Sequence, residues 1–249
     1  MTSYLVTGAS RGIGLAMVEK LLQNPSNFVI AAARHPNRSE DLQSLRTKYG
    51  DERLTTLILD YADPASTTAA AERASMLLPN GLDYLVSNAG VALQSGETFD
   101  TIDLEVFEEE LRINTIAPVR VVRAFLPLVR KGKGRKVVFI TSRLGSLELA
   151  PNFGALSVTY STTKAALNFI ARRWAPVLKQ EGIATVLIHP GWVETDMGDE
   201  LTDWMKDHLP ERRKISVDQS ATDCLKVIQD SKCENAIKLY SHDGTTVPL

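Results

Sequence analysis

The sequence predicts an α/β fold, in which helices cover both faces of a doubly wound parallel sheet of about seven strands. Short β-branched runs alternate along the chain with helical segments, as expected of successive βαβ units. The runs do not alternate cleanly between apolar and polar residues, which is typical of strands buried on both faces. No repeat, low-complexity tract or long Pro/Gly linker interrupts residues 1–249, so we expect a single domain.

The apolar runs and the segments between them give the expected elements. The expected strands are residues 4–6, 28–33, 54–59, 83–87, 136–140, 184–188 and 236–240. The expected helices are residues 13–23, 65–77, 104–129, 160–180 and 217–229. Pro118, Pro127 and Pro176 fall inside two of these helices, where each removes an N–H group and should bend or break the helix. Ligands of such folds bind outside the carboxyl ends of the strands, so motifs that follow strands are the candidates for a site.

Composition and charge exclude several classes of function. The formal net charge is -2, which leaves no basic excess for nucleic acid and no polybasic run for an anionic membrane. No apolar run is long enough to cross a bilayer, and no signal peptide precedes the first motif. Cys224 and Cys233 are too few for a disulfide framework and have no His or Cys at metal spacing, so we expect no metal site. These features predict a reduced, cytoplasmic protein.

A glycine-rich turn follows the first expected strand directly and opens the first helix. Its sequence is Thr7-Gly8-Ala9-Ser10-Arg11-Gly12-Ile13-Gly14. Gly8 permits the tight turn, Gly12 lets backbone approach a pyrophosphate, and Gly14 lets the helix pack on the strand. The helix N-terminus offers free N–H groups to the phosphates. An ordinary tight turn is the alternative for the glycines alone, but their position between strand and helix favours a Rossmann-type dinucleotide site.

Four further signatures follow in order. They are Asn88-Ala89-Gly90, Thr141-Ser142, the Y-x-x-x-K sequence Tyr160-Ser161-Thr162-Thr163-Lys164, and Pro190-Gly191-Trp192-Val193-Glu194-Thr195. Together with the glycine turn, this set resembles the short-chain dehydrogenase/reductase family over residues 4–243. Residues 142–146 and 164–168 look most like the branch of sniffer-type carbonyl reductases, the bacterial C-factor and fungal ketoreductases. The resemblance implies hydride transfer between a nicotinamide cofactor and a carbonyl or secondary alcohol.

The chemistry explains why a tyrosine and a lysine stand in this pattern. Reduction of a ketone needs a hydride, which only the nicotinamide can supply, and a proton donor within hydrogen-bond reach of the oxygen. Tyr160 can donate, but its unperturbed pKa is ~10. Lys164 should project from the same helix face and lower that pKa, and a value of ~7 would take about 4 kcal/mol of differential stabilisation. An exposed Tyr–Lys pair is the alternative for the motif in isolation; the other signatures favour catalysis.

Ser142 and Asn114 complete the expected catalytic set. The Ser142 hydroxyl can donate to the substrate oxygen and stabilise the developing alkoxide, although serines after strands are also common in turns. The resemblance implies the catalytic role for Ser142 rather than for its neighbour Thr141. It also implies that Asn114 holds a helix irregularity and a water that connects to the lysine. Pro118 is consistent with a helix that cannot run smoothly here.

The residue after the second strand indicates which cofactor binds. A carboxylate there would bind the 2′-hydroxyl of NAD, but this strand leads into Arg34, and no acid follows until Glu40. Arg34 and Arg11 could bind a 2′-phosphate, or they could be solvated loop charges; the family pattern favours NADP(H). The resemblance places further cofactor contacts, which are Asp60 at the adenine, Asn88, Ala89 and Gly90 beside the adenosine ribose, Tyr160 and Lys164, and Pro190, Gly191, Val193 and Thr195 at the nicotinamide.

The sequence says less about the substrate site than about the cofactor site. Residues 147–154 lengthen the stretch between Ser142 and Tyr160 and should form a loop over the nicotinamide. By resemblance, residues 196–214 are a variable substrate lid, which Met197, Leu201, Trp204 and Met205 could make apolar; an amphipathic helix on the core is the alternative. These features suggest a bulky apolar or aromatic ketone or aldehyde as small-molecule substrate, and a homodimer or homotetramer is compatible with them.

The alternative function is a non-catalytic NADP(H)-binding sensor or signalling protein. The complete catalytic set of Asn114, Ser142, Tyr160 and Lys164 argues against it, because a sensor needs no proton relay.

Overall fold

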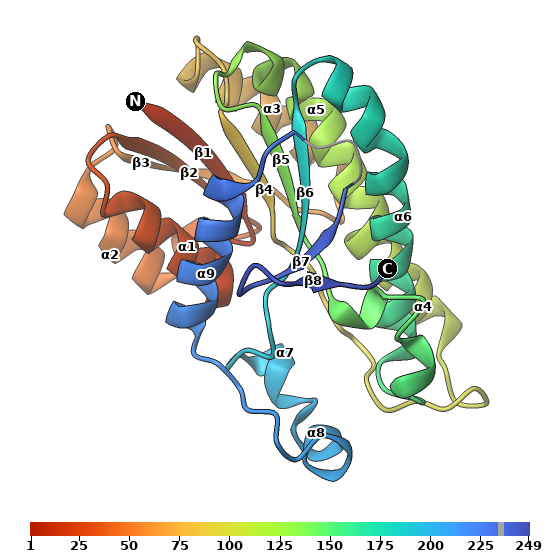
Figure 1. Cartoon of the computed structure of the whole chain (residues 1–249). Coiled ribbons are helices and arrows are strands. Elements are labelled where there is room, and N and C mark those ends of the chain that lie inside the picture. Colours follow the sequence, from red (N-terminus) through yellow and green to blue (C-terminus); the bar gives the residue numbers. More distant parts are fainter. Residues whose placement is uncertain (234–236) are drawn as a thin grey trace.

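One eight-stranded sheet organises the computed structural model, which describes residues 1–233 and 237–249 (Figure 1). The strand order is β3-β2-β1-β4-β5-β6-β7-β8. All neighbouring strands are parallel except β7 and β8. The strands are β1 (Thr2–Thr7), β2 (Asn27–Ala33), β3 (Leu54–Ile58), β4 (Tyr84–Ser87), β5 (Lys136–Ile140), β6 (Ala184–His189), β7 (Leu239–Ser241) and β8 (Thr246–Val247).

The Rossmann-type doubly wound sheet is therefore confirmed, with one more strand than the seven predicted. The additional strand, β8, has two residues and pairs antiparallel with β7. A strand this short leaves no periodic pattern in the sequence, so only its pairing reveals it. The predicted seventh strand, 236–240, begins at Leu239 in the structure, and Ala236 lies outside the described residues.

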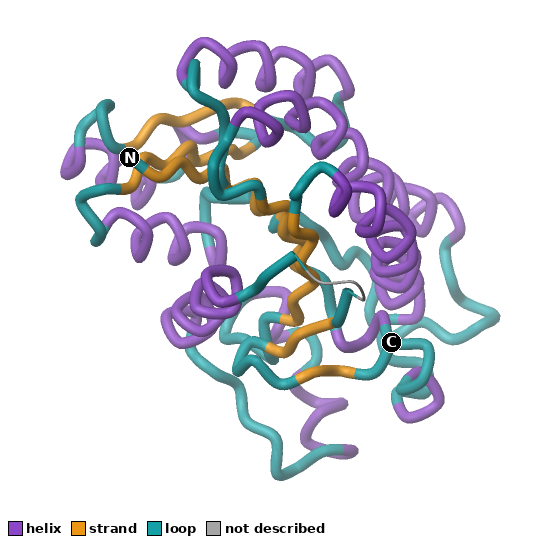
Figure 2. Tube along the Cα trace, turned by 45° about the horizontal axis from the view of Figure 1, so that its top comes forward, coloured by secondary structure: helices purple, strands orange, loops and turns teal. Residues whose placement is uncertain are grey.

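Helices cover both faces of the sheet, as Figures 1 and 2 show. One layer contains α1, α2 and α9, and the other contains α3, α4, α5 and α6. The helices are α1 (Gly12–Leu22), α2 (Glu40–Tyr49), α3 (Pro64–Leu77), α4 (Leu104–Leu111), α5 (Ala117–Lys131), α6 (Val158–Gln180), α7 (Asp196–Asp199), α8 (Thr202–His208) and α9 (Val217–Asp230). Helix α2 was not predicted, because only Leu42 and Leu45 of its ten residues are buried and its mean hydropathy is low.

The core lies on the two faces of the sheet, because successive side chains of a strand point to opposite sides. Leu5 of β1 belongs to the cluster that includes Phe125 of α5 and Leu167 of α6. Its neighbour Val6 belongs to the other cluster, with Met17 of α1. Burial on both faces explains why the strands read as unbroken apolar runs.

The long helix predicted over residues 104–129 consists of α4 and α5, joined by a π-helical turn, Arg112–Ile116. Pro118 lies in the first turn of α5, where its missing N–H is tolerated. Helices α5 and α6 continue through Pro127 and Pro176, so neither helix breaks there, and a bend at these residues stays a prediction. Each proline removes one hydrogen bond, and burial of one helix face against the sheet compensates for that loss.

The carboxyl ends of the parallel strands lie together at one edge of the sheet, at the bottom of Figure 1. Helices α7 and α8 extend below that edge. Within the described ranges, no helix has both the length and the apolar character needed to span a bilayer.

Candidate active site

The glycine turn after β1 is packed so tightly at Gly8 and Gly14 that a side chain would not fit there. Gly8 has φ +66° and Gly12 has φ +56°, a region that L side chains rarely adopt. A Cβ on Gly14 would lie 2.4 Å from the Gly8 carbonyl oxygen and 2.6 Å from Asn88 Nδ2. The turn thus brings backbone to the end of β1 as closely as the glycine pattern predicts.

Helix α1 begins at this turn without a cap. Arg11 at the N-cap position makes no side-chain capping hydrogen bond, and the first turn holds no acidic residue. By contrast, α2, α3, α4 and α9 are capped by Ser39, Asp63, Asp103 and Ser216. The N–H groups at the start of α1 are therefore left for another acceptor, and a phosphate group is the acceptor that such a terminus favours.

The motif Asn88-Ala89-Gly90 is fixed to the glycine turn by hydrogen bonds. Asn88 Nδ2 donates to the Thr7 carbonyl oxygen over 2.9 Å, and Thr7 Oγ1 accepts from the N–H groups of Asn88 and Ala89 over 2.9 and 3.1 Å. A Cβ on Gly8 would come within 2.9 Å of Ala89 Cα. The ends of β1 and β4 therefore form one rigid unit, in which Asn88 has a structural role.

Tyr160 lies in the first turn of α6 and Ser142 lies two residues after the end of β5; both residues line the same cavity. Burial raises the pKa of Tyr160 to about 12; the Ser142 hydroxyl lowers it, and the charge of Glu110 raises it. The prediction of a lowered pKa does not hold for the protein alone, because desolvation of the phenolate outweighs the favourable contacts. Tyr160 is therefore protonated at neutral pH and can donate.

Lys164 lies one turn further along α6 and is buried. Its Nζ donates to the Ile140 carbonyl oxygen over 3.1 Å and lies 5.5 Å from the centroid of the Tyr160 ring. Burial lowers the pKa of Lys164 to about 8, so the amine is still mostly protonated at neutral pH. The predicted common face of Tyr160 and Lys164 is thus present in the structure.

Asn114 lies in the π-helical turn and is fully buried, which confirms the predicted helix irregularity. Its amide exchanges two hydrogen bonds with the Val91 backbone, over 2.7 and 2.9 Å, and donates to Thr163 Oγ1 over 3.1 Å. A Cβ on Gly90 would lie 3.2 Å from Asn114 Oδ1 and 3.4 Å from Lys164 Nζ. The two side chains therefore converge on the space beside Gly90. The water between them stays a prediction.

Two buried polar residues near the site were missed by sequence reasoning. Glu110, at the end of α4, is fully buried, and its Oε1 accepts from the Leu93 N–H over 2.6 Å. It stands in a run of three glutamates, so nothing in the sequence marks it. Asn168 Oδ1 accepts from Thr141 Oγ1 over 2.7 Å. That bond occupies the Thr141 hydroxyl and agrees with the choice of Ser142 as the donor.

A cavity of about 610 Å³ opens in front of Ser142 and Tyr160. Besides Tyr160, the predicted cofactor residues that line this cavity are Ile13, Pro190, Gly191, Val193 and Thr195. A Cβ on Gly12 would lie 3.6 Å from Thr195 Cγ2, so the glycine turn and the segment after β6 adjoin.

The remaining predicted cofactor residues lie apart from this cavity. Arg34 directly follows β2 and is exposed. Asp60 lies two residues after β3, and its Oδ1 accepts from the Ala62 N–H over 3.0 Å. The exposed Arg11 guanidinium pairs with Asp196 of α7. The roles of Arg11, Arg34 and Asp60 toward a cofactor stay predictions.

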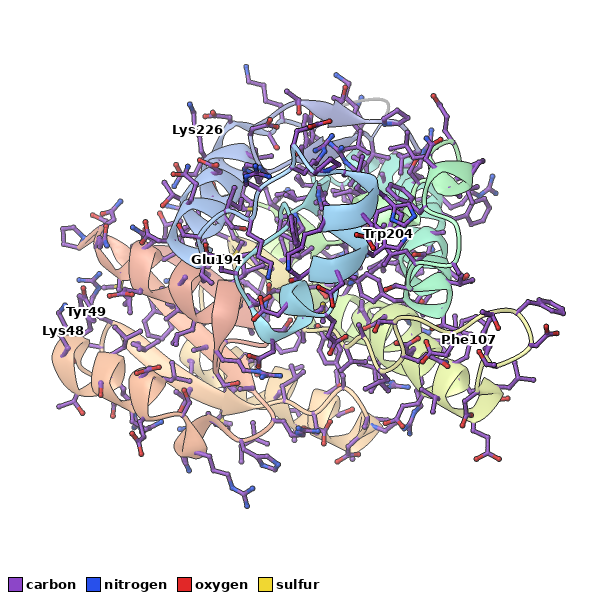
Figure 3. The ribbon with its side chains drawn as sticks, turned by 90° about the horizontal axis from the view of Figure 1, so that it is seen from below. Lys48, Tyr49, Phe107, Glu194, Trp204 and Lys226 are labelled. Carbon is purple, nitrogen blue, oxygen red and sulfur yellow. The ribbon has the colours of Figure 1, made fainter. Side chains whose placement is uncertain are left out.

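The segments expected over the site border the same cavity. Leu149, Asn152 and Phe153 line it from the loop between β5 and α6. Met197, Leu201 and Met205 line it from residues 196–214. Trp204 does not line it; its ring stacks on His208 at 4.3 Å and lies 6.3 Å from the ring of Phe153 (Figure 3). The described residues hold no cluster of three His, Cys, Asp or Glu side chains that could bind a metal.

Comparisons with known proteins agree with this geometry. The sequence profile described as short chain dehydrogenase matches residues 3–206. An uncharacterized oxidoreductase of Schizosaccharomyces pombe is 32% identical over 251 residues, which cover 98% of this chain and 97% of that protein. The C-signal protein of Myxococcus xanthus is 36% identical over 167 residues, which cover 67% of this chain and 92% of that protein.

Solved structures are similar over the whole chain. An NADPH-bound carbonyl reductase from chicken fatty liver is 34% identical, with a TM-score of 0.87 and coverage of 100% of this chain and 99% of the other. The carbonyl reductase Sniffer of Drosophila melanogaster is 25% identical, with a TM-score of 0.87 and coverage of 100% of both chains.

Proposed function

This chain belongs to the short-chain dehydrogenase family of oxidoreductases, and from that membership we propose that it is an NADP(H)-dependent carbonyl reductase. One observation carries the proposal. Ser142 and Tyr160 line the same cavity, and the amine of the buried Lys164 lies 5.5 Å from the centroid of the tyrosine ring. A proton donor, a second hydroxyl and a cation in this arrangement match what reduction of a carbonyl group needs.

The residues present fit a dinucleotide. The uncapped start of α1 and the glycine turn would hold the pyrophosphate, Arg34 and Arg11 the 2′-phosphate, and Val193 and Thr195 the nicotinamide. The Arg11–Asp196 pair is exposed and therefore weak, so it does not prevent Arg11 from binding a phosphate. NADPH in the similar carbonyl reductase from chicken fatty liver supports the choice of cofactor. When bound, the cofactor supplies the hydride.

The protein groups handle the proton. The protonated Tyr160 hydroxyl donates its proton to the carbonyl oxygen as that oxygen gains negative charge, and Ser142 donates a hydrogen bond to the same oxygen. The Lys164 ammonium group, 5.5 Å from the ring centroid, stabilises the phenolate that remains. Asn114, which donates to Thr163 and so connects to the Tyr160 backbone carbonyl, holds the turn where a water would replace the proton that Lys164 passes back to the Tyr160 phenolate.

The cavity favours a bulky apolar or aromatic ketone or aldehyde. Apolar side chains line it from two segments outside the sheet, the loop before α6 and residues 196–214. The contact between Phe153 and Trp204 joins these segments. We assign residues 196–214 as a substrate lid on this basis.

The test is oxidation of NADPH across ketones, aldehydes and quinones by the wild type, Tyr160→Phe and Tyr49→Phe. Tyr49 lies on α2, far from the site (Figure 3), so its substitution is the matched control. We expect Tyr160→Phe to lower kcat by about 10²- to 10⁴-fold with NADPH affinity retained. More than about a hundredth of wild-type kcat in Tyr160→Phe would show that another group donates the proton. Tight NADPH binding without turnover of any carbonyl would favour the alternative, a non-catalytic NADP(H) sensor.

A further inference from the structure

The cavity in front of Tyr160 has an apolar side and a charged side. The apolar side comes from the lid and the loop before α6. The charged side comes from Arg143 and Arg212, with His189 and His242 beside them, and we call these four residues the basic wall. Arg213 also lines the cavity, but its guanidinium donates to the backbone carbonyl oxygens of Pro210 and Arg212. Nothing in the reduction of a neutral ketone uses these four residues, so they call for a different explanation.

Sheet topology builds the basic wall from neighbouring strands. β5, β6 and β7 are adjacent and parallel, so their carboxyl ends meet. Arg143 follows Ser142 shortly after β5, His189 is the last residue of β6, and His242 directly follows β7. Arg212 reaches the wall from the lid. Two arginines from different segments thus face the same cavity.

The two guanidinium groups have no partner of opposite charge at contact distance. Neither Arg143 nor Arg212 takes part in an ion pair within the part of the chain that the structure describes. The Nε atom of Arg143 is buried and has no hydrogen-bond acceptor. Burial and the nearby charge of Arg212 lower the pKa of Arg143, and Asp243 offsets this only in part. Arg212 itself is exposed to water, so the unmet group is the buried Nε–H of Arg143, for which an anion in the cavity would supply an acceptor.

The histidines do not neutralise the wall. His242 Nδ1 lies 2.8 Å from Asp223 Oδ2, which occupies that carboxylate. Burial, followed by the charges of Arg143 and His242, lowers the pKa of His189 to about 3, so His189 is a neutral hydrogen-bonding group. Its Nδ1 atom is buried without a partner. Glu200 is the one carboxylate among the residues that line the cavity in the described structure.

We propose that the carbonyl substrate carries a carboxylate, which binds between Arg143 and Arg212 while its apolar body lies against the lid. This inference rests on the proposed carbonyl reductase function and narrows its substrates to oxo acids. A guanidinium fork matches the planar carboxylate, and an anion between two like charges removes their repulsion. Because Arg143 directly follows Ser142, the carboxylate would also orient the carbonyl toward Ser142 and Tyr160.

The test compares acids with their methyl esters, which keep the ketone but lose the charge. Benzoylformate, benzoylpropionate and benzoylbutyrate, each beside its methyl ester, vary the distance between the two groups. The measured quantity is the ratio of kcat/KM for acid over ester, in the wild type, Arg143→Met, Arg212→Met and the control Arg73→Met. Arg73 is exposed on α3, and no residue of α3 lines the cavity.

For at least one pair of acid and methyl ester, we expect the wild type to have a kcat/KM about ten to a hundred times higher for the acid. One or two charge-assisted hydrogen bonds to the carboxylate would produce a preference of this size. Both wall variants should lower that ratio at least about tenfold, and Arg73→Met should leave it unchanged. A wild-type ratio near one for every pair, or a ratio that Arg143→Met does not change, overturns the proposal.

A calorimetric titration of the same acids and esters into the NADP⁺-saturated protein separates this inference from the proposed function. If no ketone is reduced but the acids bind more tightly than the esters and lose that preference in Arg143→Met, the reductase proposal fails and the carboxylate site stands. Equal binding of acids and esters overturns the carboxylate site, whatever the turnover.

Discussion

Lys164 places an ammonium group where folding has to bury it, and Lys164→Met should therefore stabilise the protein at neutral pH. The side chain is 4% exposed, and its pKa falls from 10.5 to about 8. This lowering of the pKa means that the fold destabilises the charged form of Lys164, relative to the neutral form, by about 3 kcal/mol. Methionine removes this cost but also the hydrogen bond to Ile140, which contributes about 1 kcal/mol. We expect a net gain of about 2 kcal/mol in the free energy of unfolding at pH ~7.

The pH dependence of this gain provides the sharper check. The folded pKa lies below the unfolded one, so between about pH 8 and 10.5 the unfolded chain binds a proton that the native chain has lost. The stability of the wild type from this group thus rises with pH across that window. The advantage of Lys164→Met should shrink and vanish by about pH 10. Urea unfolding followed by tryptophan fluorescence, in steps of about one pH unit from ~7 to ~10, measures it.

The control is Lys226→Met on α9, an exposed lysine away from the site (Figure 3). The free energy of unfolding of Lys226→Met should differ little from that of the wild type, and this difference should not depend on pH. If Lys164→Met is less stable than the wild type near neutral pH, or if its difference does not change with pH, the burial of a charged Lys164 is not the cost described above.

Three other substitutions test separate parts of the structure. Arg34→Ala should weaken NADPH binding at least about tenfold and barely affect NADH, because only the 2′-phosphate meets the guanidinium; fluorescence titrations with equal losses for both would contradict the assignment. Gly14→Ala should abolish NADPH binding and lower stability by about 1–3 kcal/mol, because its Cβ would lie 2.4 Å from the Gly8 carbonyl oxygen; calorimetry that shows intact binding would mean that the turn can open. Asp83→Asn should cost about 2–4 kcal/mol in urea unfolding, since the carboxylate accepts from three backbone N–H groups of other segments; a loss below about 0.5 kcal/mol would show that those bonds re-form.

Local chemistry made much of the site predictable from sequence. The glycine turn could be placed because positive φ angles and the absence of a Cβ are requirements of the backbone itself. The common face of Tyr160 and Lys164 follows from the helical repeat, which needs no tertiary information. The irregular helix at Asn114 was expected from the family resemblance and from Pro118.

Other features depend on which segments the fold brings together. The two-residue strand β8 exists only through its pairing with β7. Glu110 stands in an acidic run in the sequence, yet the packing of α4 buries it beside Tyr160. Arg11 appeared free for a phosphate, and the fold pairs it with Asp196, which is 185 positions away.

The sequence by itself determined the alternation of strands and helices, the glycine turn and the common helix face of Tyr160 and Lys164. These follow from local geometry and from patterns of residues close together in the chain. Only the tertiary structure decided that the ends of β5, β6 and β7 gather Arg143, His189 and His242 around one cavity. It also decided that the pKa of Tyr160 is raised in the protein alone. The physical reason is that burial and charge proximity arise from contacts between distant segments, which local pattern does not encode.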